Sequence, residues 1–461
     1  MLRDKVQQNP AAALVLVMLT AVCLIGIQTA TGNTLAAVCS ACVISLIIAI
    51  LCGATAKEMK DQVLLVLKRS ASTVVILALI AYACGVWLTG GTIAVMLYGI
   101  AKISLPRLSL MTAFLASGLM AYITGSSFST ISSMGLVTML VAVGFGMNQS
   151  AAVGAVVSGA VLGNKISPVS DTVNLTCSMC EIDHHAHRKA MRLRTLLATA
   201  VTAGVFLILG LISPISSDGS VGETMCRQLR DSFQLSPLCL LPLCVLIALT
   251  YTKLSTIQNL ILTIAVSVVC GAVSQKIPLH EMLLAGLTGF RAPTGAEGII
   301  RSLSGGGLLA SGKTLTAIVL TNVLGGLLVS SSITTLLFDR VKQRERDERS
   351  LALAVWAMSL GILFMTGNQV LAIILVAPAF SDLFSKQENG LPTLAGIFAD
   401  TTVVCGPLLP WSVMRLFTAQ CYHLDSCAYI PFAVFCIVMP LTALLRIVQF
   451  RPISLAKRKA L

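Results

Sequence analysis

Residues 108–164 read LSLMTAFLASGLMAYITGSSFSTISSMGLVTMLVAVGFGMNQSAAVGAVVSGAVLGN and contain no Asp, Glu, Lys or Arg. A helix of roughly 20 apolar residues crosses the hydrocarbon core of a bilayer, so this stretch has room for two crossings. It runs into KISPVSDT (165–172), which places a lysine and an aspartate in apolar surroundings. The stretch predicts a membrane-embedded fold and a functional role for its two charged residues.

The remainder of the chain has the same apolar character. Of its 461 residues, 56% are hydrophobic and 11% are charged, against about 25% charged residues in soluble domains. Further charge-free windows span residues 6–56, 70–101, 195–217, 232–252, 254–275, 314–338, 350–381 and 426–445. The pattern predicts an all-α, polytopic helical membrane protein with about eleven or twelve transmembrane helices. We expect Ala11–Ala30 to be the first of these helices rather than a cleaved signal peptide.

The basic residues indicate orientation in the membrane. Lys and Arg number 32 against 19 Asp and Glu, which gives a net charge of +13. Because they cluster at span ends, we interpret them as cytoplasmic loop residues and expect no nucleic-acid partner. Both termini are then cytoplasmic, the number of crossings is even, and the segment near 391–415 re-enters. The run DRVKQRERDER (339–349) is interpreted as a cytoplasmic loop rather than a regulatory switch.

A weak internal repeat suggests two halves. YITGSSFSTISS (122–133) resembles FMTGNQVLAIIL (364–375), and each is followed by a small-residue helix that runs into polar residues. Transporters are often built from inverted repeats whose broken helices meet near the bilayer midplane. We therefore predict one membrane transporter domain over 1–461, with two inverted halves. The first-half core covers 70–200 with a broken helix at 159–176, and the second covers 310–425 with a broken or re-entrant segment at 393–415.

The two broken segments carry the candidate binding residues. We expect Gly163, Pro168, Pro407 and Pro410 to interrupt helices, because proline cannot continue the helical hydrogen-bond ladder. Unwound carbonyls and side-chain oxygens suit hard cations, and a carboxylate can instead bind a proton. Lys165 is a candidate partner for Asp171. The candidate cation, proton or substrate ligands are Asp171, Asp400, Asn164, Lys165, Ser167, Ser170, Thr172, Asn174, Thr124, Ser126, Ser127, Asn368, Gln369, Thr401 and Thr402.

An alternative places both segments in loops outside the membrane. Lys165 then extends its amine to water, Asp171 caps the next helix, and Trp411 lies in the interfacial aromatic belt.

Two motifs resemble a phosphate-binding loop and a zinc site, but the residues around them do not fit these sites. GLLASGKT (307–314) fits the phosphate-loop pattern, but the residues before it are not strand-like, so we expect a glycine-rich segment leading into a span. In CSMCEIDHHAH (177–187), the cysteine and histidine pairs are too close for a zinc finger. A polar loop is the favoured interpretation, with a histidine pH sensor as the alternative. We expect no metal site, no cofactor beyond transported ions, and no disulfide framework among the 15 cysteines.

SGAVLGNKISPVSDTVNLT (158–176) resembles the signature of the NhaC family of Na+/H+ antiporters, G-D-K-x-S-P-x-S-D-T-T-N-L. The resemblance extends to TGSSFSTISSMG before it, and to Asp183, His187 and Met191, which match a D-x-x-x-H-x-x-x-M spacing. In the second half, GNQVLAIIL, ADTT and GPLLPWS resemble three further family blocks. Two positions depart from the pattern: Asn164 replaces an aspartate, and Ala399 replaces the glutamate before Asp400.

The resemblance implies a secondary transporter of the bacterial inner membrane that exchanges Na+ or another monovalent cation for H+ by alternating access. Asp171 and Asp400 would be the exchanging carboxylates. An alternative is a carrier of amino acids or carboxylates such as malate and lactate on the same scaffold, with Asn164 marking the changed substrate. A third is a membrane enzyme or assembly scaffold, but no histidine lies in an apolar window near either broken helix, so we expect no enzyme. The expected partners are the bilayer, a small cation or organic solute, and a second copy in a homodimer.

Overall fold

The computed structural model describes residues 10–31, 33–213, 220–293, 298–331, 338–339, 341–342, 347–387, 389–422, 424 and 427–449. Part of the charged run 339–349 and the basic residues at both chain ends lie outside these ranges. Within them, the chain is helical, and its only β pairing is an isolated bridge between Phe290 and Gly305.

The helices fall into three consecutive groups along the chain. The first group is α2 (Pro10–Thr31), α3 (Thr34–Leu51), α4 (Ala56–Thr89), α5 (Thr92–Ile103), η1 (Pro106–Leu108), α6 (Ser109–Thr124), α7 (Ser127–Thr130), the π-turn η2 (Ile131–Gly135), α8 (Leu136–Gly144), α9 (Gln149–Ile166), α10 (Asp171–Met179) and α11 (His184–Ile212). The second is α12 (Ser220–Ser232), η3 (Pro237–Leu240), α13 (Leu241–Thr250), α14 (Thr256–Gln275), α15 (Leu279–Thr288) and α16 (Gly298–Ser302). The third is α17 (Gly312–Ser330), α19 (Glu348–Thr366), α20 (Gln369–Ser385), α21 (Gly390–Asp400), α22 (Thr402–Cys405), η4 (Gly406–Leu408), α23 (Val413–Tyr422), η5 (Ile430–Phe432) and α24 (Val434–Gln449).

The helices have the length and surface of membrane spans. Among the described residues, nine helices are long and apolar enough to cross a membrane, or eleven if two bent pairs each form one span. Large apolar side chains cover the outside of α11, where Leu193, Leu196 and Ile212 are more than 60% exposed. Apolar side chains on an outer surface are stable against lipid rather than water. The chain is therefore a multi-pass helical membrane protein, as the sequence predicted, and α2 coincides with the expected first span.

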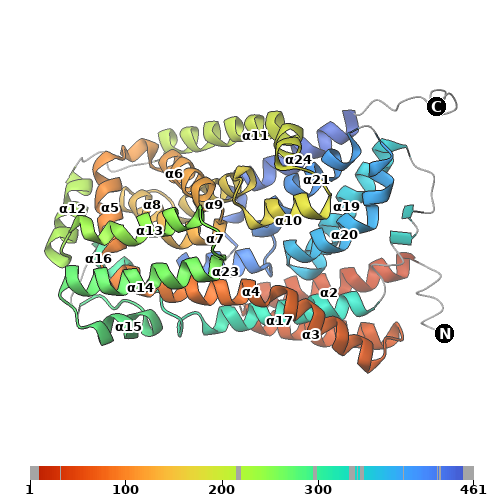
Figure 1. Ribbon diagram of the computed structural model, residues 1–461, viewed down its shortest axis with the longest axis horizontal. Helices are drawn as coiled ribbons and strands as arrows, with labels where there is room; N and C mark the ends of the chain where they lie inside the picture. The colour runs from red at the N-terminus through yellow and green to blue at the C-terminus, as the bar shows by residue number, and fades with distance from the viewer. Residues whose placement is uncertain are drawn as a thin grey trace.

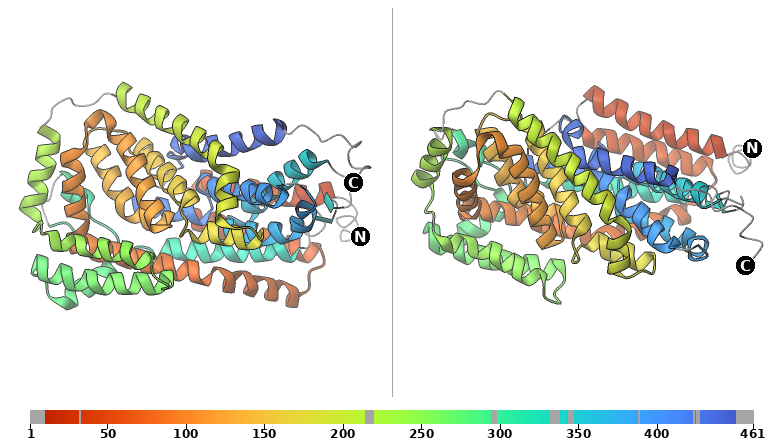
Figure 2. Two further views of the ribbon diagram at one scale, coloured as in Figure 1. Left: turned by 45° about the horizontal axis from the view of Figure 1, so that its top comes forward. Right: turned by 90° about the horizontal axis from the view of Figure 1, so that it is seen from above.

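The helices are arranged around two breaks near the middle of the molecule (Figure 1). In that view, α6, α8 and α9 lie to the left of centre, and α19, α20 and α21 lie to the right. Figure 2 shows the red helices α2 and α3 side by side at one edge, where they pack against each other. The long helix α11 packs against α6, α9, α21 and α24, so it contacts both halves.

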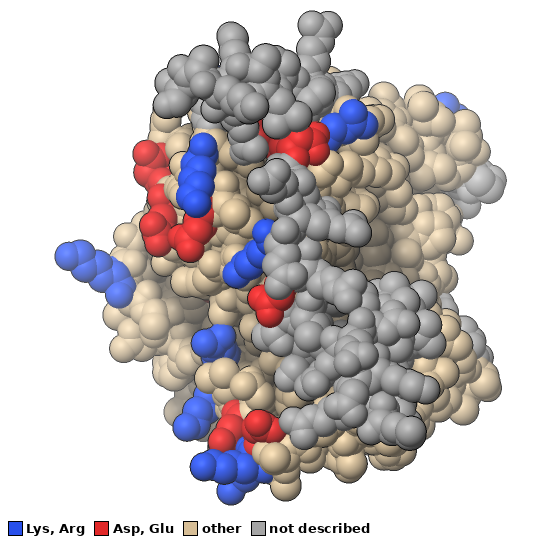
Figure 3. Space-filling view, turned by 90° about the vertical axis from the view of Figure 1, so that its right-hand side faces the viewer, with Lys and Arg blue, Asp and Glu red and all other residues tan. Residues whose placement is uncertain are grey.

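Charged side chains gather at the end of the molecule that faces right in Figure 1. Figure 3 shows Lys and Arg together with Asp and Glu across that end, separated by uncharged surface. Mixed charges of this kind belong to a surface in contact with water or lipid headgroups.

The internal repeat is visible as a repeated backbone geometry. Gly125, directly after α6, has φ +65°, and Gly367, directly after α19, has φ +62°. The next residue caps the following helix in each case: Ser126 at φ −136°, ψ 114° and Asn368 at φ −126°, ψ 111°. Glycine adopts a positive φ at little cost, which explains why TG is the shared dipeptide. The weak echo between 122–133 and 364–375 therefore marks equivalent breaks in the two halves.

Glycines bring α6 and α9 into close contact. A Cβ atom on Gly159 would lie 2.1 Å from the carbonyl oxygen of Phe114, and one on Gly163 would lie 2.1 Å from that of Gly118. Small residues four apart allow helix backbones to approach closely in membranes. Gly163 lies inside α9, which continues to Ile166, so its predicted role as a helix breaker is wrong.

The glycine-rich GLLASGKT segment leads into α17, which begins at Gly312. In the described residues before it, a short helix, α16, stands where a phosphate-binding loop needs a buried strand.

Candidate functional site

The first broken helix is α9–α10, whose axes differ by 46°. The break covers residues 167–170 and contains Pro168, whose ring and missing N–H prevent α9 from continuing. The Ser170 hydroxyl caps α10 by accepting the amide of Val173 at 3.4 Å. Asp171 is thereby the first residue of α10, where the helix dipole favours a negative charge.

Three side chains hold this break in one geometry. The Ser170 hydroxyl donates to Asn164 Oδ1 at 2.7 Å, and Asn164 Nδ2 donates to Thr172 Oγ1 at 3.2 Å. The hydroxyls of Ser170 and Thr172 are 3.0 Å apart, which closes the ring. Because the ring joins the last turn of α9 to the first turn of α10, it fixes the position of Asp171 between its members.

The second broken segment follows α21, which ends at Asp400. The chain continues through α22 and η4 and resumes a longer helix only at α23. Pro407 lies in η4 and Pro410 lies just beyond it, so both predicted prolines fall in the break. The Tyr429 hydroxyl donates to the Pro407 carbonyl at 2.7 Å, and Ser412 Oγ donates to the Gly406 carbonyl at 2.5 Å.

The last turn of α9 and most of the second broken segment are buried inside the protein, whereas Pro168 and Asp171 of the first break are exposed. Lys165, Asp400 and Trp411 are each 1% exposed. The indole N–H of Trp411 donates to the Phe364 carbonyl at 2.8 Å, so this ring packs within the helices rather than in an interfacial belt. The alternative of two external loops is therefore wrong for these three residues.

Lys165 and Asp400 connect the two broken segments through an ion pair. Lys165 Nζ lies 2.8 Å from Asp400 Oδ1, and the guanidinium of Arg194 on α11 lies 2.6 Å from Asp400 Oδ2 through Nη2. Arg194 Nε also donates to that oxygen at 2.7 Å. One carboxylate thus joins α9, α11 and α21. We call Lys165, Arg194 and Asp400 the ionic cluster.

Lys165 is fully satisfied in the ionic cluster. Besides Asp400, its ammonium group contacts Met191 Sδ at 2.9 Å and donates to Thr195 Oγ1 at 3.1 Å. An ammonium has three N–H donors, so all three have partners. The predicted pairing of Lys165 with Asp171 is wrong for this conformation, because Asp400 of the other half takes that place.

The ionic cluster carries a net charge of +1, from two cations and one carboxylate. Burial of charges is costly unless they are paired and hydrogen-bonded, which this arrangement provides for Asp400. Gly396 leaves space for the arginine: a Cβ atom there would lie 3.0 Å from Arg194 Nη2.

A small central cavity lies between the TG turns at Gly125 and Gly367 and the two broken segments. Its volume is about 100 Å³, and both halves contribute polar groups to its wall. The polar lining residues are Thr73, Ser126, Ser127, Asn164, Asp171, Thr172, Thr256, Asn322, Asn368, Gln369 and Ser412. Asp171 is the only acidic residue among its described lining residues. The cavity is the only one of the three described cavities to which both TG breaks contribute.

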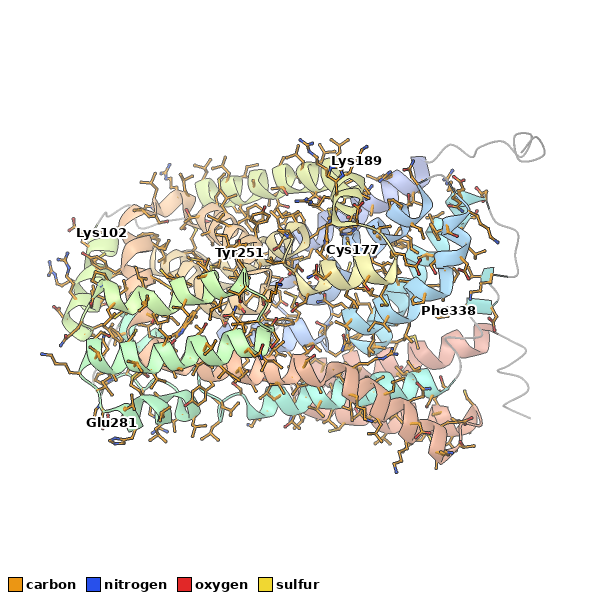
Figure 4. The ribbon with its side chains drawn as sticks, in the orientation of Figure 1. Lys102, Cys177, Lys189, Tyr251, Glu281 and Phe338 are labelled. Atoms are coloured by element: carbon orange, nitrogen blue, oxygen red, sulfur yellow. The ribbon has the colours of Figure 1, made fainter. Side chains whose placement is uncertain are left out.

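Asp171 also borders a second cavity of about 300 Å³. Its wall includes Thr124, Asn174 and Asn259, together with residues of the turn between α13 and α14. Figure 4 labels Tyr251 in this turn, inside the outline of the molecule rather than at its left or right end. Asp171 and Thr256 line both cavities, so the aspartate stands where the two spaces meet.

The central cavity has one buried oxygen that is not used in hydrogen bonding. Gln369 Oε1 has no hydrogen-bond partner among the described residues. Its neighbour Asn368 is fixed by donating to Ser70 Oγ at 3.2 Å and to Asn322 Oδ1 at 2.8 Å. A buried acceptor without a partner is costly, and water or a cation would satisfy it.

A third cavity, of about 680 Å³, lies across α23 from the central one. Phe128 lines the central cavity and Phe417 lines the third. Their rings meet edge to face with centroids 5.5 Å apart. The aromatic pair therefore stands at the boundary between the two spaces.

The structure separates the predicted ligands into three sets. The central cavity brings together Asp171, Asn164, Thr172, Ser126, Ser127, Asn368 and Gln369. The second cavity adds Thr124 and Asn174. Outside both cavities lie Lys165, Asp400, Ser167, Ser170, Thr401 and Thr402. Ser167 donates to the Tyr122 carbonyl at 2.7 Å, and Thr401 donates to that of Ile397 at 2.6 Å, so both stabilise their breaks.

Several important residues were not among the predicted ligands. Arg194 is one of the basic residues that were interpreted as cytoplasmic loop residues, although it lies within α11 and its side chain, 12% exposed, pairs with the buried Asp400. Met191 and Thr195 follow His187 at four-residue spacing and share its face of α11. That spacing is visible in the sequence, and it indicates a helix face turned toward Lys165.

Comparison with known proteins is consistent with this geometry. A sequence model described as the Na+/H+ antiporter family matches residues 6–211 and 187–448, which together span nearly the whole chain. The chain belongs to the Na+/H+ antiporter family. The resemblance of its SGAVLGNKISPVSDTVNLT segment to NhaC proteins is thereby confirmed.

The family relatives cover most of the chain. It is 28% identical over 381 residues to "Na(+)/H(+) antiporter NhaC" of Alkalihalophilus pseudofirmus, covering 82% of each protein. It is 27% identical over 384 residues to the NhaC antiporter of Bacillus subtilis, covering 82% of this chain and 84% of the relative. A "Malate-2H(+)/Na(+)-lactate antiporter" of Bacillus subtilis is 21% identical over 84% of this chain and 83% of its own length.

Proposed function

We propose that this member of the Na+/H+ antiporter family exchanges Na+ for H+ by alternating access. The observation that carries the proposal is the position of Asp171, a carboxylate at the junction of two cavities and between the broken segments of both halves. Antiport requires a group that binds either the cation or the proton, and a carboxylate meets this requirement. The cation would find further oxygen ligands in the hydroxyls and amides of the central cavity.

The two carboxylates have different roles in this proposal. Asp171 faces the cavities and exchanges Na+ for H+. Asp400 does not line a described cavity and is neutralised by Lys165 and Arg194, so it holds α9, α11 and α21 together. Opening of the ionic cluster would allow the second half to move relative to the first, which alternating access requires.

The size of the central cavity favours a small ion over an organic solute. Its volume of about 100 Å³ is well below the roughly 300–1,000 Å³ typical of sites for organic ligands. Transport of a carboxylate or an amino acid is therefore the second candidate function. We further propose that the protein lies in a bacterial inner membrane with both termini in the cytoplasm, and that it needs no cofactor and catalyses no covalent reaction. The homodimer stays a prediction.

Everted membrane vesicles from cells without other antiporters test this function. After respiration acidifies the vesicle lumen and quenches a pH-sensitive dye, addition of Na+ should restore the fluorescence. Asp171→Asn should abolish the response, because the amide can neither bind nor release the proton. Asp382→Asn is the matched control, since Asp382 is an exposed carboxylate on α20. Correctly inserted wild-type protein without a response to Na+, Li+ or K+ would refute the proposal.

A further inference from the structure

Two basic side chains meet at one tyrosine ring near the end of α5. Lys102 Nζ lies 5.0 Å from the centroid of the Tyr98 ring, and the guanidinium carbon of Arg230 on α12 lies 5.2 Å from it. Arg230 Nη2 also donates to the Tyr98 hydroxyl. The helices α5 and α12 pack against each other at the left of Figure 1, so two separate segments of the chain supply these side chains. We call Tyr98, Lys102 and Arg230 the basic triad.

The protein does not neutralise the two cations of the basic triad. Among the described residues, no carboxylate lies within 4.0 Å of the Lys102 ammonium or the Arg230 guanidinium. An ammonium has three N–H donors and a guanidinium has five, so the single oxygen of Tyr98 occupies few of them. Like charges held together repel each other, and an anion between them would remove this repulsion and accept the remaining hydrogen bonds.

The surface around the basic triad is positive as well. All six charged residues of α5, η1 and α12 are exposed: Lys102, Arg107, Glu223, Arg227, Arg230 and Asp231. Four basic and two acidic side chains leave a net charge of +2. The two acidic residues of α12 therefore do not cancel the positive charge of this surface.

Large apolar side chains are exposed beside these charges. Ile103 is 75% exposed and Leu105 is 63% exposed, and both lie within three residues of Lys102. Ile212 at the end of α11 is 70% exposed, and α11 packs against η1, which follows α5. Apolar and basic side chains share one surface at the level of a membrane where acyl chains meet headgroups. This surface therefore has the composition of a lipid contact.

The basic triad is separate from the cavities that Asp171 lines. None of its three residues belongs to the wall of a described cavity. Figure 4 labels Lys102 at the left end of the molecule, whereas Cys177 of α10 lies to the right of centre. A ligand of the triad would therefore reach it from outside the protein and not along the proposed transport pathway.

We propose that the basic triad binds the phosphate group of an anionic phospholipid from the surrounding membrane. The planar guanidinium of Arg230 suits two phosphate oxygens at once, and the Lys102 ammonium adds a compact charge. The Tyr98 hydroxyl accepts from Arg230 and keeps its own proton, which it donates to the phosphate. The acyl chains lie along the exposed side chains of Ile103 and Leu105. This site goes beyond Na+/H+ exchange and does not depend on it.

Lipid binding to the full-length protein in nonionic detergent tests the proposal. Native mass spectrometry during a titration with phosphatidylglycerol gives the apparent dissociation constant of the tightest-bound lipid, and phosphatidylcholine serves as the lipid without net charge. Lys102→Gln combined with Arg230→Gln should weaken phosphatidylglycerol binding roughly 25-fold, because each basic residue near an anionic surface contributes about a fivefold gain. Phosphatidylcholine should bind equally weakly to the wild type and to this variant.

Two further variants separate the triad from the total charge of the protein. Lys189→Gln combined with Lys386→Gln removes the same two charges from exposed positions elsewhere and should bind phosphatidylglycerol as the wild type does. Tyr98→Phe keeps the ring and both cations but removes the hydroxyl donor. It should weaken binding about fivefold, which is the loss expected for one hydrogen bond.

Three results would overturn the proposal. Wild-type phosphatidylglycerol binding by the variant at 102 and 230 would show that the triad holds no lipid. An equal loss in the variant at 189 and 386 would show that only the total charge matters. Displacement of bound phosphatidylglycerol by an equal concentration of inorganic phosphate would show that the site takes free phosphate and not a lipid. These outcomes are distinct from failure of the antiport, which the vesicle assay measures separately.

Discussion

Replacement of Asp400 by asparagine should destabilise the protein more than any other single carboxylate change. The substitution leaves Lys165, whose side chain is 0% exposed, and Arg194, whose side chain is 12% exposed, without their shared counter-ion. Removing one partner of a buried ion pair typically costs about 3–5 kcal/mol, because the remaining charge stays buried. Because Arg194 can turn toward solvent and Lys165 cannot, we expect about 4 kcal/mol, which is a large share of the roughly 5–15 kcal/mol that stabilises an ordinary domain.

A second substitution separates the charge effect from the change in shape. Lys165→Met combined with Asp400→Asn removes the buried, unpaired ammonium while keeping its length. If the loss arises from the unpaired charge, the double variant should be more stable than Asp400→Asn alone, since replacing a buried ion pair by apolar groups is often close to neutral.

Heating of the detergent-purified protein measures this effect. The fraction that remains monodisperse after a fixed time at each temperature, followed by size-exclusion chromatography, gives an apparent midpoint for every variant. We expect a midpoint many degrees lower for Asp400→Asn, a partial return for the double variant, and no change for the exposed control Asp382→Asn. An Asp400→Asn midpoint equal to that of the parent, or a double variant less stable than the single one, would refute the buried ionic cluster.

Two more substitutions follow from the packing and the cavity. Gly163→Ala should prevent accumulation of folded protein in the membrane, because the new methyl group would lie 2.1 Å from the Gly118 carbonyl; Gly99→Ala, with no atom within 4 Å, should accumulate normally on a membrane blot. Asn164→Asp adds a second carboxylate to the central cavity and should lower the Na+ concentration for half-maximal dye recovery by roughly tenfold, equivalent to about 1.4 kcal/mol of cation binding. An unchanged half-maximal concentration would show that the cation does not bind beside residue 164.

The fold was predictable from the sequence because lipid constrains it so strongly. Long charge-free windows can satisfy their backbone groups in a membrane only as helices, so apolar length alone indicates the spans. The two broken segments were also predictable, since Pro168, Pro407 and Pro410 cannot continue a helix. The TG dipeptides at Gly125 and Gly367 mark two further helix ends, because glycine adopts a positive φ at little cost. Gly163 was misassigned because a glycine in a membrane helix can allow close helix packing without ending the helix.

The partners of the charged residues were not predictable from local spacing. Asp171 is six residues from Lys165, but Pro168 redirects the chain between them, and Asp400 arrives from the other half instead. Arg194 lies in a run of basic residues whose charge suggested a loop. Its location depends on where α11 meets α21, which no short pattern encodes. The face formed by His187, Met191 and Thr195 has a visible period, but the period does not identify what it contacts.

The chain differs from the family pattern at position 164, next to the cavity that Asp171 lines. At position 164 the family pattern has aspartate, and here the Asn164 amide donates to Thr172 while its oxygen accepts from Ser170. An aspartate cannot make the first of these bonds, so asparagine keeps the break rigid with no charge of its own. That leaves Asp171 as the sole carboxylate described on the cavity, balanced in total charge by the +1 of the ionic cluster. In the proposed antiport, Asp171 therefore binds either the cation or the proton, while Asp400 joins the two broken segments through Lys165 and Arg194.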